Sequence, residues 1–172
     1  METSDSENML VRMVASPRQI VDSYVAVCDL LGLDLALVQT NIRADAQLCM
    51  LYEDMTPGSP YIIVDVGGDS IDVGILDETL RVTGTVEEGG NSLTEAIAQQ
   101  LHISHAKAQS TKVTKGIAAG PQQEKIKAAV TPILDKVIVE IKRMIRFYEE
   151  RIQDGADISQ ILIVGGGANM PG

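Results

Sequence analysis

An acidic residue and two glycines follow directly on an aliphatic run, and a second aliphatic run resumes at once. The stretch reads Tyr61-Ile62-Ile63-Val64 and then DVGGDSIDVGIL, from Asp65 to Leu76. Packing gives no reason for a carboxylate at the end of a buried strand. A plain loop does not need two such regular flanking strands. Glycine has no Cβ, so backbone N–H groups beside it can approach a phosphate or a ribose closely. The stretch therefore predicts a strand, a ligand-binding turn and a second strand, with a merely tight turn as the alternative.

A second glycine turn follows another aliphatic run near the end of the sequence. Ile161 to Val164 leads into Gly165-Gly166-Gly167. Two such turns in one chain, one of them carrying an acid, favour a phosphate or nucleoside site over simple turns. A carboxylate at Asp65 can hold a magnesium ion, usually through water, or orient an attacking water. Neither turn fits GxxxxGK[ST] or GxGxxG, so a P-loop and a Rossmann site are not indicated.

The hydrophobic periodicity predicts an α/β fold in which helices pack on a sheet. Strands are expected at residues 9–15, 33–38, 61–65, 71–76, 80–86 and 161–164, with the fourth and fifth joined as a hairpin through residues 77–79. Helices are expected from a Ser16-Pro17 start to Gly32, at 43–52, from a capping box at Ser92, at 104–113 and at 122–153. Pro132 is expected to kink or divide the last helix, and residues 56–60 form a breaker segment.

Composition narrows the class of protein further. The chain has 172 residues and a net charge of −10, which argues against non-specific nucleic-acid binding because such binding needs clustered Lys and Arg. No run approaches the roughly 20 apolar residues of a membrane span, and no signal peptide opens the chain. Cys28 and Cys49 are interpreted as buried thiols in a reducing cytosol. His102 and His105 are interpreted as solvated residues.

Several of these motifs resemble the actin-like ATPase superfamily, in its PilM/FtsA subgroup. DVGGDSIDVGIL is similar to the second phosphate motif, which reads DLGGGT-FDVSIL in DnaK-type chaperones. ILIVGGGANMPG resembles the adenosine motif and its FtsA- and PilM-type ending. EEGGNSLTEAIAQQLHISHAKAQSTK is similar to the GG-x-x-LT-x-AIA segment of the subgroup, and EIKRMIRFYEER favours PilM over FtsA. The resemblance implies a partial actin-like (ribonuclease-H-like) ATPase fold that binds ATP and Mg.

The resemblance also assigns roles to individual residues. Asp65 matches the acid that serves the magnesium and the attacking water. Lys112 matches a lysine near the base, with a solvated helix lysine as an equal alternative. The matched backbone contacts are Gly67, Gly68 and Ser70 at the phosphates, Gly89 and Gly90 near the ribose, and Gly165, Gly166 and Gly167 at the nucleoside.

The sequence departs from the family pattern at several points. Asp69 stands where many relatives have glycine, alanine or serine, and a carboxylate beside phosphates repels them unless it points away or binds metal. Gln109 replaces the usual glutamate. The first phosphate motif has no match, and the chain ends at Gly172, so we interpret it as a fragment. We expect part of an FtsA/PilM-type subdomain 1C at 1–40, a connecting helix and linker of 1A at 41–60, and the second actin-like half, 2A with a helical 2B insertion, at 61–172.

Three function classes follow from the resemblance. The first is an ATP-binding adaptor of type IV pilus assembly, placed at the inner face of the cell membrane through a partner, the short cytoplasmic tail of a PilN-like inner-membrane protein. The second is an FtsA-like cell-division protein, and the third is a sugar-kinase relative. We expect no direct membrane insertion, possible self-association through uncovered aliphatic surface, and no ATP hydrolysis by these residues alone.

Overall fold

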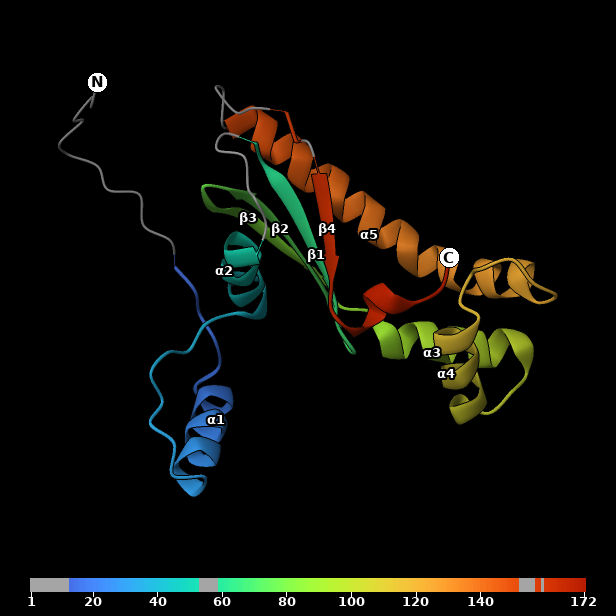
Figure 1. Cartoon of the computed structure of the whole chain (residues 1–172), viewed down its shortest axis with the longest axis horizontal. Coiled ribbons are helices and arrows are strands. Elements are labelled where there is room, and N and C mark those ends of the chain that lie inside the picture. The colour runs from blue at the N-terminus through green and yellow to red at the C-terminus, as the bar shows by residue number, and fades with distance from the viewer. Residues whose placement is uncertain (1–12, 53–58, 152–156, 159) are drawn as a thin grey trace. The chain divides into compact units, whose positions relative to one another are not determined.

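The computed structural model describes residues 13–52, 59–151, 157–158 and 160–172. The chain divides into two compact units, Met1–Gln39 and Thr40–Gly172, and each is described by itself. Figure 1 gives the labels of the helices and strands. The mixed α/β fold expected from the sequence is confirmed.

The larger unit is built on a four-stranded sheet in the order β3-β2-β1-β4. The strands are β1 (Tyr61–Val66), β2 (Ile71–Asp77), β3 (Thr79–Val86) and β4 (Gln160–Val164). β1, β2 and β3 form an antiparallel meander, whereas β4 pairs with β1 in parallel. Glu78 has φ +53° in the turn between β2 and β3. All four strand predictions in this unit and the hairpin are therefore confirmed.

One helix covers each face of this sheet (Figure 1). Because successive strand residues point to opposite faces, Ile62 and Val64 lie on the side of α5 (Gln123–Arg151), and Ile63 lies on the side of α2 (Asn41–Tyr52). The α5 side also buries Val73, Ile75, Met144 and Tyr148. The α2 side buries Ile42, Ala46, Leu76 and Leu80. Asp65, two residues after Ile63, consequently lies on the α2 side.

The remaining helices form a separate apolar cluster at the end of the sheet. α3 (Gly90–Leu101) and α4 (His105–Thr114) pack with the first half of α5 through Leu93, Ile97, Ala108, Ile126, Val130 and Ile133. α4 begins at His105, one residue after the predicted start at Ser104, and the Ser104 side chain accepts a hydrogen bond from the Lys107 N–H. The predicted start of α3 at Ser92 is wrong, because the helix begins two residues earlier at Gly90.

Pro132 lies inside α5 and does not divide it. An internal proline removes a helix hydrogen bond and costs roughly 3 kcal/mol. Packing on both sides of it keeps the helix whole: Val130 and Ile133 are buried in the helical cluster, and Val137 is buried against the sheet.

The smaller unit contains one described helix, α1 (Arg18–Leu30), with Pro17 at its N-cap. The predicted helix is therefore confirmed, although proline stands at the cap and not at the first helical position. The strand predicted at 33–38 is wrong, since those residues form no regular element. Of the strand predicted at 9–15, residues 13–15 are not in a strand and residues 9–12 lie outside the described residues, as do residues 56–58 of the breaker segment.

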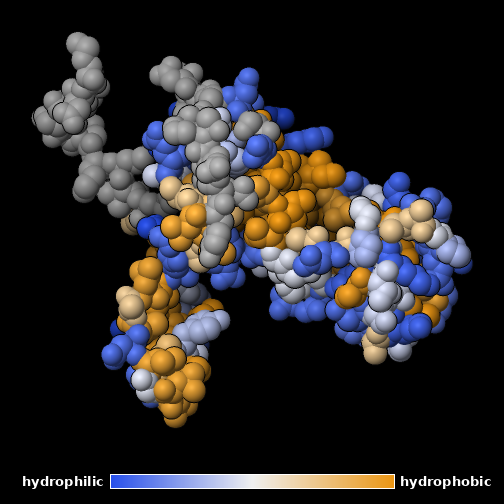
Figure 2. Space-filling model, in the orientation of Figure 1, coloured by the Kyte–Doolittle hydropathy of each residue, from blue (hydrophilic) through white to orange (hydrophobic). Residues whose placement is uncertain are grey.

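Each unit leaves aliphatic side chains exposed. On edge strand β4, Ile161 is 55% exposed and Ile163 is 59% exposed. In α1 no side chain is buried, and Leu30 is 86% exposed. Figure 2 shows apolar surface, in orange, over the sheet and over α1. None of the helices in the described part of the chain has the length and apolarity to cross a membrane.

Candidate functional site

A pocket of about 260 Å³ opens at the end of the sheet where β1 and β4 finish. Its walls come from the turn after β1, the start of α3, one side of α4 and the short 3-10 helix η1 (Gly166–Asn169). The lining residues are Val66, Gly67, Gly68, Gly90, Asn91, Leu93, Gln109, Lys112, Val113, Gly166, Gly167, Asn169 and Met170. Both glycine motifs singled out in the sequence therefore meet at one site.

Residues 67–70, the first glycine loop, are held by the first turn of α3. The Gly90 N–H donates to the Gly67 carbonyl at 2.9 Å, and the Asn91 N–H donates to the Gly68 carbonyl at 2.8 Å. In a trans peptide the N–H points opposite to the carbonyl. The N–H groups of Gly68 and Asp69 therefore point away from α3, and within the described residues neither donates to a protein acceptor. The loop thus offers two oriented donors of the kind that bind anions.

Gly89 explains why α3 starts earlier than the capping pattern suggested. A Cβ on Gly89 would lie 2.6 Å from the Gly68 carbonyl oxygen and 2.8 Å from that of Gly67. Only glycine permits this approach of two backbones. The Ser92 hydroxyl accepts a long hydrogen bond of 3.5 Å from the Gly89 N–H, so Ser92 supports the helix from inside its first turn.

Lys112 is buried on the α4 side of the pocket. Its Nζ donates to the Gly90 carbonyl at 2.6 Å, and burial lowers the pKa of the ammonium. No acidic side chain in the described parts of the chain forms an ion pair with it. An ammonium has three donors, so two are left for a ligand. The solvated interpretation of Lys112 is wrong, because the side chain is only 8% exposed.

Thr94, and Gln109 on the pocket wall, extend this polar network. The Thr94 hydroxyl lies 2.9 Å from the Gly90 carbonyl oxygen and 2.7 Å from Gln109 Oε1. A hydroxyl has one hydrogen, so one of the two contacts needs another donor. Rotating the Gln109 amide would place its NH₂ toward the Thr94 oxygen, which satisfies both contacts.

The second glycine loop, residues 165–167, packs against the end of β1. Gly165 has φ +85°, and a Cβ there would lie 2.3 Å from Asp65 Oδ1. A Cβ on Gly167 would lie 2.2 Å from Val66 Cγ1, whereas one on Gly166 would meet nothing within 4 Å. Gly165 and Gly167 are therefore required for close packing, and Gly166 leaves open space on the pocket side.

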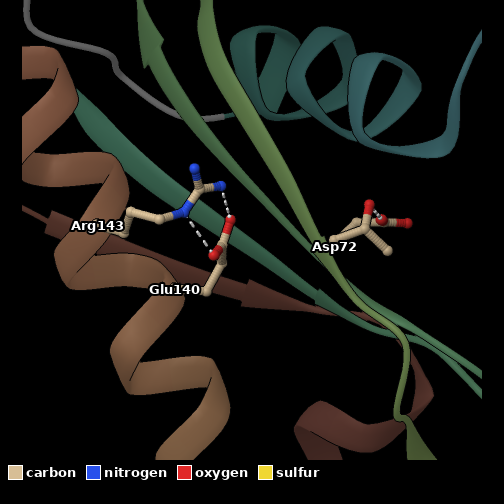
Figure 3. Close-up of polar contacts among 4 residues, drawn as sticks. Asp72, Glu140 and Arg143 are labelled. Carbon is tan, nitrogen blue, oxygen red and sulfur yellow. Dashed lines mark hydrogen bonds and ion pairs between the residues drawn. The ribbon is translucent and has the colours of Figure 1, made fainter.

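Asp65 stands among other carboxylates on the α2 side of the sheet. It pairs in register with Asp72 of β2, whose carboxylate accepts a 2.5 Å hydrogen bond from the Thr85 hydroxyl. Figure 3 shows Asp72 across the strands from the Glu140–Arg143 ion pair of α5. Burial and then the Asp65 charge and contact raise the pKa of Asp45 on α2. Asp45 Oδ2 is buried and has no hydrogen-bond partner within the described residues.

This acidic group fits an indirect role with magnesium better than a closed metal cage. Magnesium prefers oxygen ligands, and proteins usually hold it through one or two carboxylates together with substrate phosphates and waters. Asp65 supplies such an oxygen beside the first glycine loop. In the described part of the chain no three His, Cys, Asp or Glu side chains are arranged to hold a metal ion by themselves.

The pocket brings together most of the residues predicted from the sequence, though not all. Gly67, Gly68, Gly90, Lys112, Gly166 and Gly167 line it, whereas Asp65, Ser70, Gly89 and Gly165 support it from behind. The Ser70 carbonyl accepts the Gly67 N–H at 3.0 Å, which closes the loop. Sequence reasoning missed Asn91, Asn169 and Met170 on the pocket wall and Asp45 beside Asp65.

Solved structures place this architecture in the class of actin-like ATPase folds. The chain superimposes on MreB 5 of Spiroplasma citri bound to AMPPNP with a TM-score of 0.69 and 15% identity, over 91% of this chain and 55% of that one. The archaeal actin homolog Ta0583 gives a TM-score of 0.56 and 17% identity, over 77% and 44%. The predicted actin-like fold is thereby confirmed.

The sequence identifies the family within this class. All 172 residues match the profile described as type IV pilus assembly protein PilM, so the chain belongs to the PilM family. It also superimposes on the PilM–PilN type IV pilus biogenesis complex with a TM-score of 0.66 and 22% identity. That match covers 88% of this chain and 42% of the other, so the chain spans less than half of that relative. The search of curated proteins found no significant match.

Proposed function

We propose that this chain carries the nucleotide-binding half of an actin-like adaptor in type IV pilus assembly. One observation carries the proposal: Gly67 and Gly68 of the first glycine loop, which carries the two oriented N–H donors, line the same pocket as the buried ammonium of Lys112. Donors of this kind beside the N-terminus of α3, where the helix dipole is positive, suit a phosphorylated ligand. The structural likeness to MreB 5, which was solved bound to AMPPNP, supports ATP as that ligand.

In this proposal, different residues of the pocket contact different parts of the nucleotide. Gly68 and the Asp69 N–H meet the phosphates, Gly166 leaves room for the nucleoside, and Gly167, which packs against Val66, borders that space. Lys112 approaches the base or ribose with its two remaining donors. Asp65 would orient water on a bound magnesium ion, and that ion would neutralise phosphate charge. In this proposal the larger unit from residue 61 is the second actin-like half, and residues 1–40 belong to subdomain 1C.

Binding by these 172 residues should be weak. The pocket volume of about 260 Å³ lies below the roughly 300–1,000 Å³ of small-molecule sites. We expect Mg-ATP to bind in the millimolar range and no ATP hydrolysis, because the described wall contacts the phosphates from one side only, whereas phosphoryl transfer needs them positioned from both.

An NMR titration with Mg-ATP tests the proposal. The amide resonances of Gly68 and Asp69 should shift, and Lys112→Met should weaken binding about tenfold or more, since a charge-assisted hydrogen bond contributes roughly 1.5–3 kcal/mol. The Gly90 carbonyl keeps the Thr94 hydroxyl as a donor, so the variant should fold. Lys107→Met, an exposed lysine on the same helix, is the matched control. Equal affinities for the two variants, or unshifted loop amides, would contradict nucleotide binding here.

The partner proposed for the intact protein is the cytoplasmic tail of a PilN-like membrane protein, which would hold it at the inner face of the cell membrane. The PilM–PilN complex among the structural relatives supports this choice. Since residues 33–38 form no strand, the surface for the tail in the smaller unit is α1, with Ile20, Tyr24 and Val27 about half exposed or more. Self-association through β4 is the competing use of exposed aliphatic surface. A tail peptide should shift α1 resonances, and unshifted α1 resonances would refute this docking.

A further inference from the structure

The first glycine loop is tied to α3 by a side-chain bond as well as by backbone bonds. Asn91 Nδ2 donates to Asp69 Oδ1 at 2.8 Å. The Asn91 amide also passes beside Gly68, because a Cβ on Gly68 would lie 3.6 Å from Asn91 Nδ2. Asn91 lines the pocket, and Asp69 is exposed. The Asp69 carboxylate is thus drawn to the side of the loop on which the Gly67 and Gly68 carbonyls also lie.

We propose that Asn91 is a positioning residue that holds the Asp69 carboxylate against the start of α3, so that the loop presents its N–H groups and not its acid to a bound phosphate. The inference rests on the proposed nucleotide binding at this loop. It gives Asp69 a place that does not repel the ligand: the carboxylate lies near the positive end of α3, and its hydrogen-bonded oxygen is turned toward Asn91.

The backbone bonds alone do not fix Asp69. They hold the carbonyls of Gly67 and Gly68, and the loop closes through the Gly67 N–H and the Ser70 carbonyl. Within the described residues, the Asp69 side chain is held only by Asn91. If that bond is lost, an exposed carboxylate on a two-glycine turn is free to rotate toward the side that the Gly68 and Asp69 N–H groups face.

Four variants separate the possible roles. Asn91→Asp sets two carboxylates against each other and should lower Mg-ATP affinity about tenfold, as Asn91→Ala should to a smaller extent. Asp69→Asn keeps an acceptor for Asn91 and removes the charge, so its affinity should equal or exceed that of the wild type. The double variant Asp69→Asn with Asn91→Asp reverses donor and acceptor at unchanged net charge, and should restore affinity to within about threefold of the wild type.

Helix damage cannot mimic these results. Residue 91 is the second residue of α3 after the Gly89 cap, and aspartate is favourable there because of the helix dipole. Affinities come from amide shifts in Mg-ATP titrations. Backbone ¹⁵N relaxation of residues 67–70 without nucleotide should show greater mobility in Asn91→Asp and recovery in the double variant.

The outcomes separate the proposed nucleotide binding from the positioning role of Asn91. If the amides of the wild-type loop do not shift with Mg-ATP, the proposed function fails. The ¹⁵N relaxation of residues 67–70 without nucleotide then still tests whether the Asn91–Asp69 bond holds the loop. If the wild type binds but the double variant stays as weak as Asn91→Asp, Asn91 contacts the nucleotide directly and the positioning role is refuted. Unchanged loop mobility in Asn91→Asp also refutes it.

Discussion

Replacing Gly165 by alanine tests how strictly the second glycine loop is required. Gly165 has φ +85° and ψ 171°, a region of backbone space that is essentially restricted to glycine and costs other residues of order 1–3 kcal/mol. The added Cβ would also lie 2.3 Å from Asp65 Oδ1 and 2.7 Å from the Val66 carbonyl oxygen. The Asp65 side chain can rotate, but the Val66 oxygen belongs to a strand in the sheet.

Strain and overlap together set the size of the effect. The cost of placing alanine in this backbone conformation, together with a forced shift of the loop, gives an expected loss of about 2–4 kcal/mol in the free energy of unfolding. That is a large fraction of the roughly 5–15 kcal/mol by which a domain is stable. Rotation of Asp65 toward Asp45 would add like-charge repulsion, because burial and then the Asp65 charge already raise the pKa of Asp45.

Gly166 is the matched control for this measurement. It is the next residue, its φ is not positive, and an added Cβ meets nothing within 4 Å. Gly166→Ala should therefore change stability by less than about 1 kcal/mol, with a gain possible through the unfolded chain. Urea unfolding followed by circular dichroism gives both values. Equal losses for the two variants would refute the argument from φ and close packing.

Two further predictions concern ionisable residues. Asp65→Asn should weaken magnesium-dependent ATP binding, measured by titration with and without magnesium. The free energy of unfolding should stay unchanged or rise by up to about 1 kcal/mol, because the substitution relieves repulsion with Asp45. Unchanged nucleotide affinity would refute the functional role of Asp65. Burial and the hydrogen bond to Asp77 raise the pKa of Tyr148 from 10.0 to about 12. The folded state therefore holds this proton longer than the unfolded state, so stability should fall as pH rises from about 10 to about 12. Tyr148→Phe should remove the tyrosinate step near pH 12, followed by absorbance near 295 nm. A wild-type titration with no step near pH 12 would contradict this prediction.

The strands were predictable because burial on both faces leaves a continuous aliphatic signal. Tyr61 to Val64 lie between α2 and α5, so every position in that run is apolar. Residues 33–38 are also mostly apolar, LDLALV, yet form no strand. A strand exists only when another strand takes its backbone hydrogen bonds, and the described part of the smaller unit supplies none. Local pattern is therefore insufficient where the pairing partner is absent.

The glycine positions of the site could be predicted from the sequence, whereas some of its side chains could not. Glycine positions show in sequence because no other residue permits the approach of Gly89 to residues 67 and 68. Asp45 lies 20 positions before Asp65, and no periodic pattern connects them. Asn91 was hidden because Ser92 suggested a helix cap, which placed Asn91 before the helix. The backbone hydrogen bonds from residues 90 and 91 to the loop, together with the Asn91 side-chain bond to Asp69, reveal its place.

The peptide unit between Gly90 and Asn91 connects the two sides of the pocket. Its carbonyl accepts the Lys112 ammonium, and its N–H donates to the Gly68 carbonyl. A cation on the oxygen polarises the unit and makes the N–H a stronger donor, as in other hydrogen-bond chains. The charge of Lys112 should therefore stabilise the first glycine loop before any nucleotide binds. Lys112→Met should increase the mobility of residues 67–70 in the ligand-free protein, whereas Lys107→Met should not.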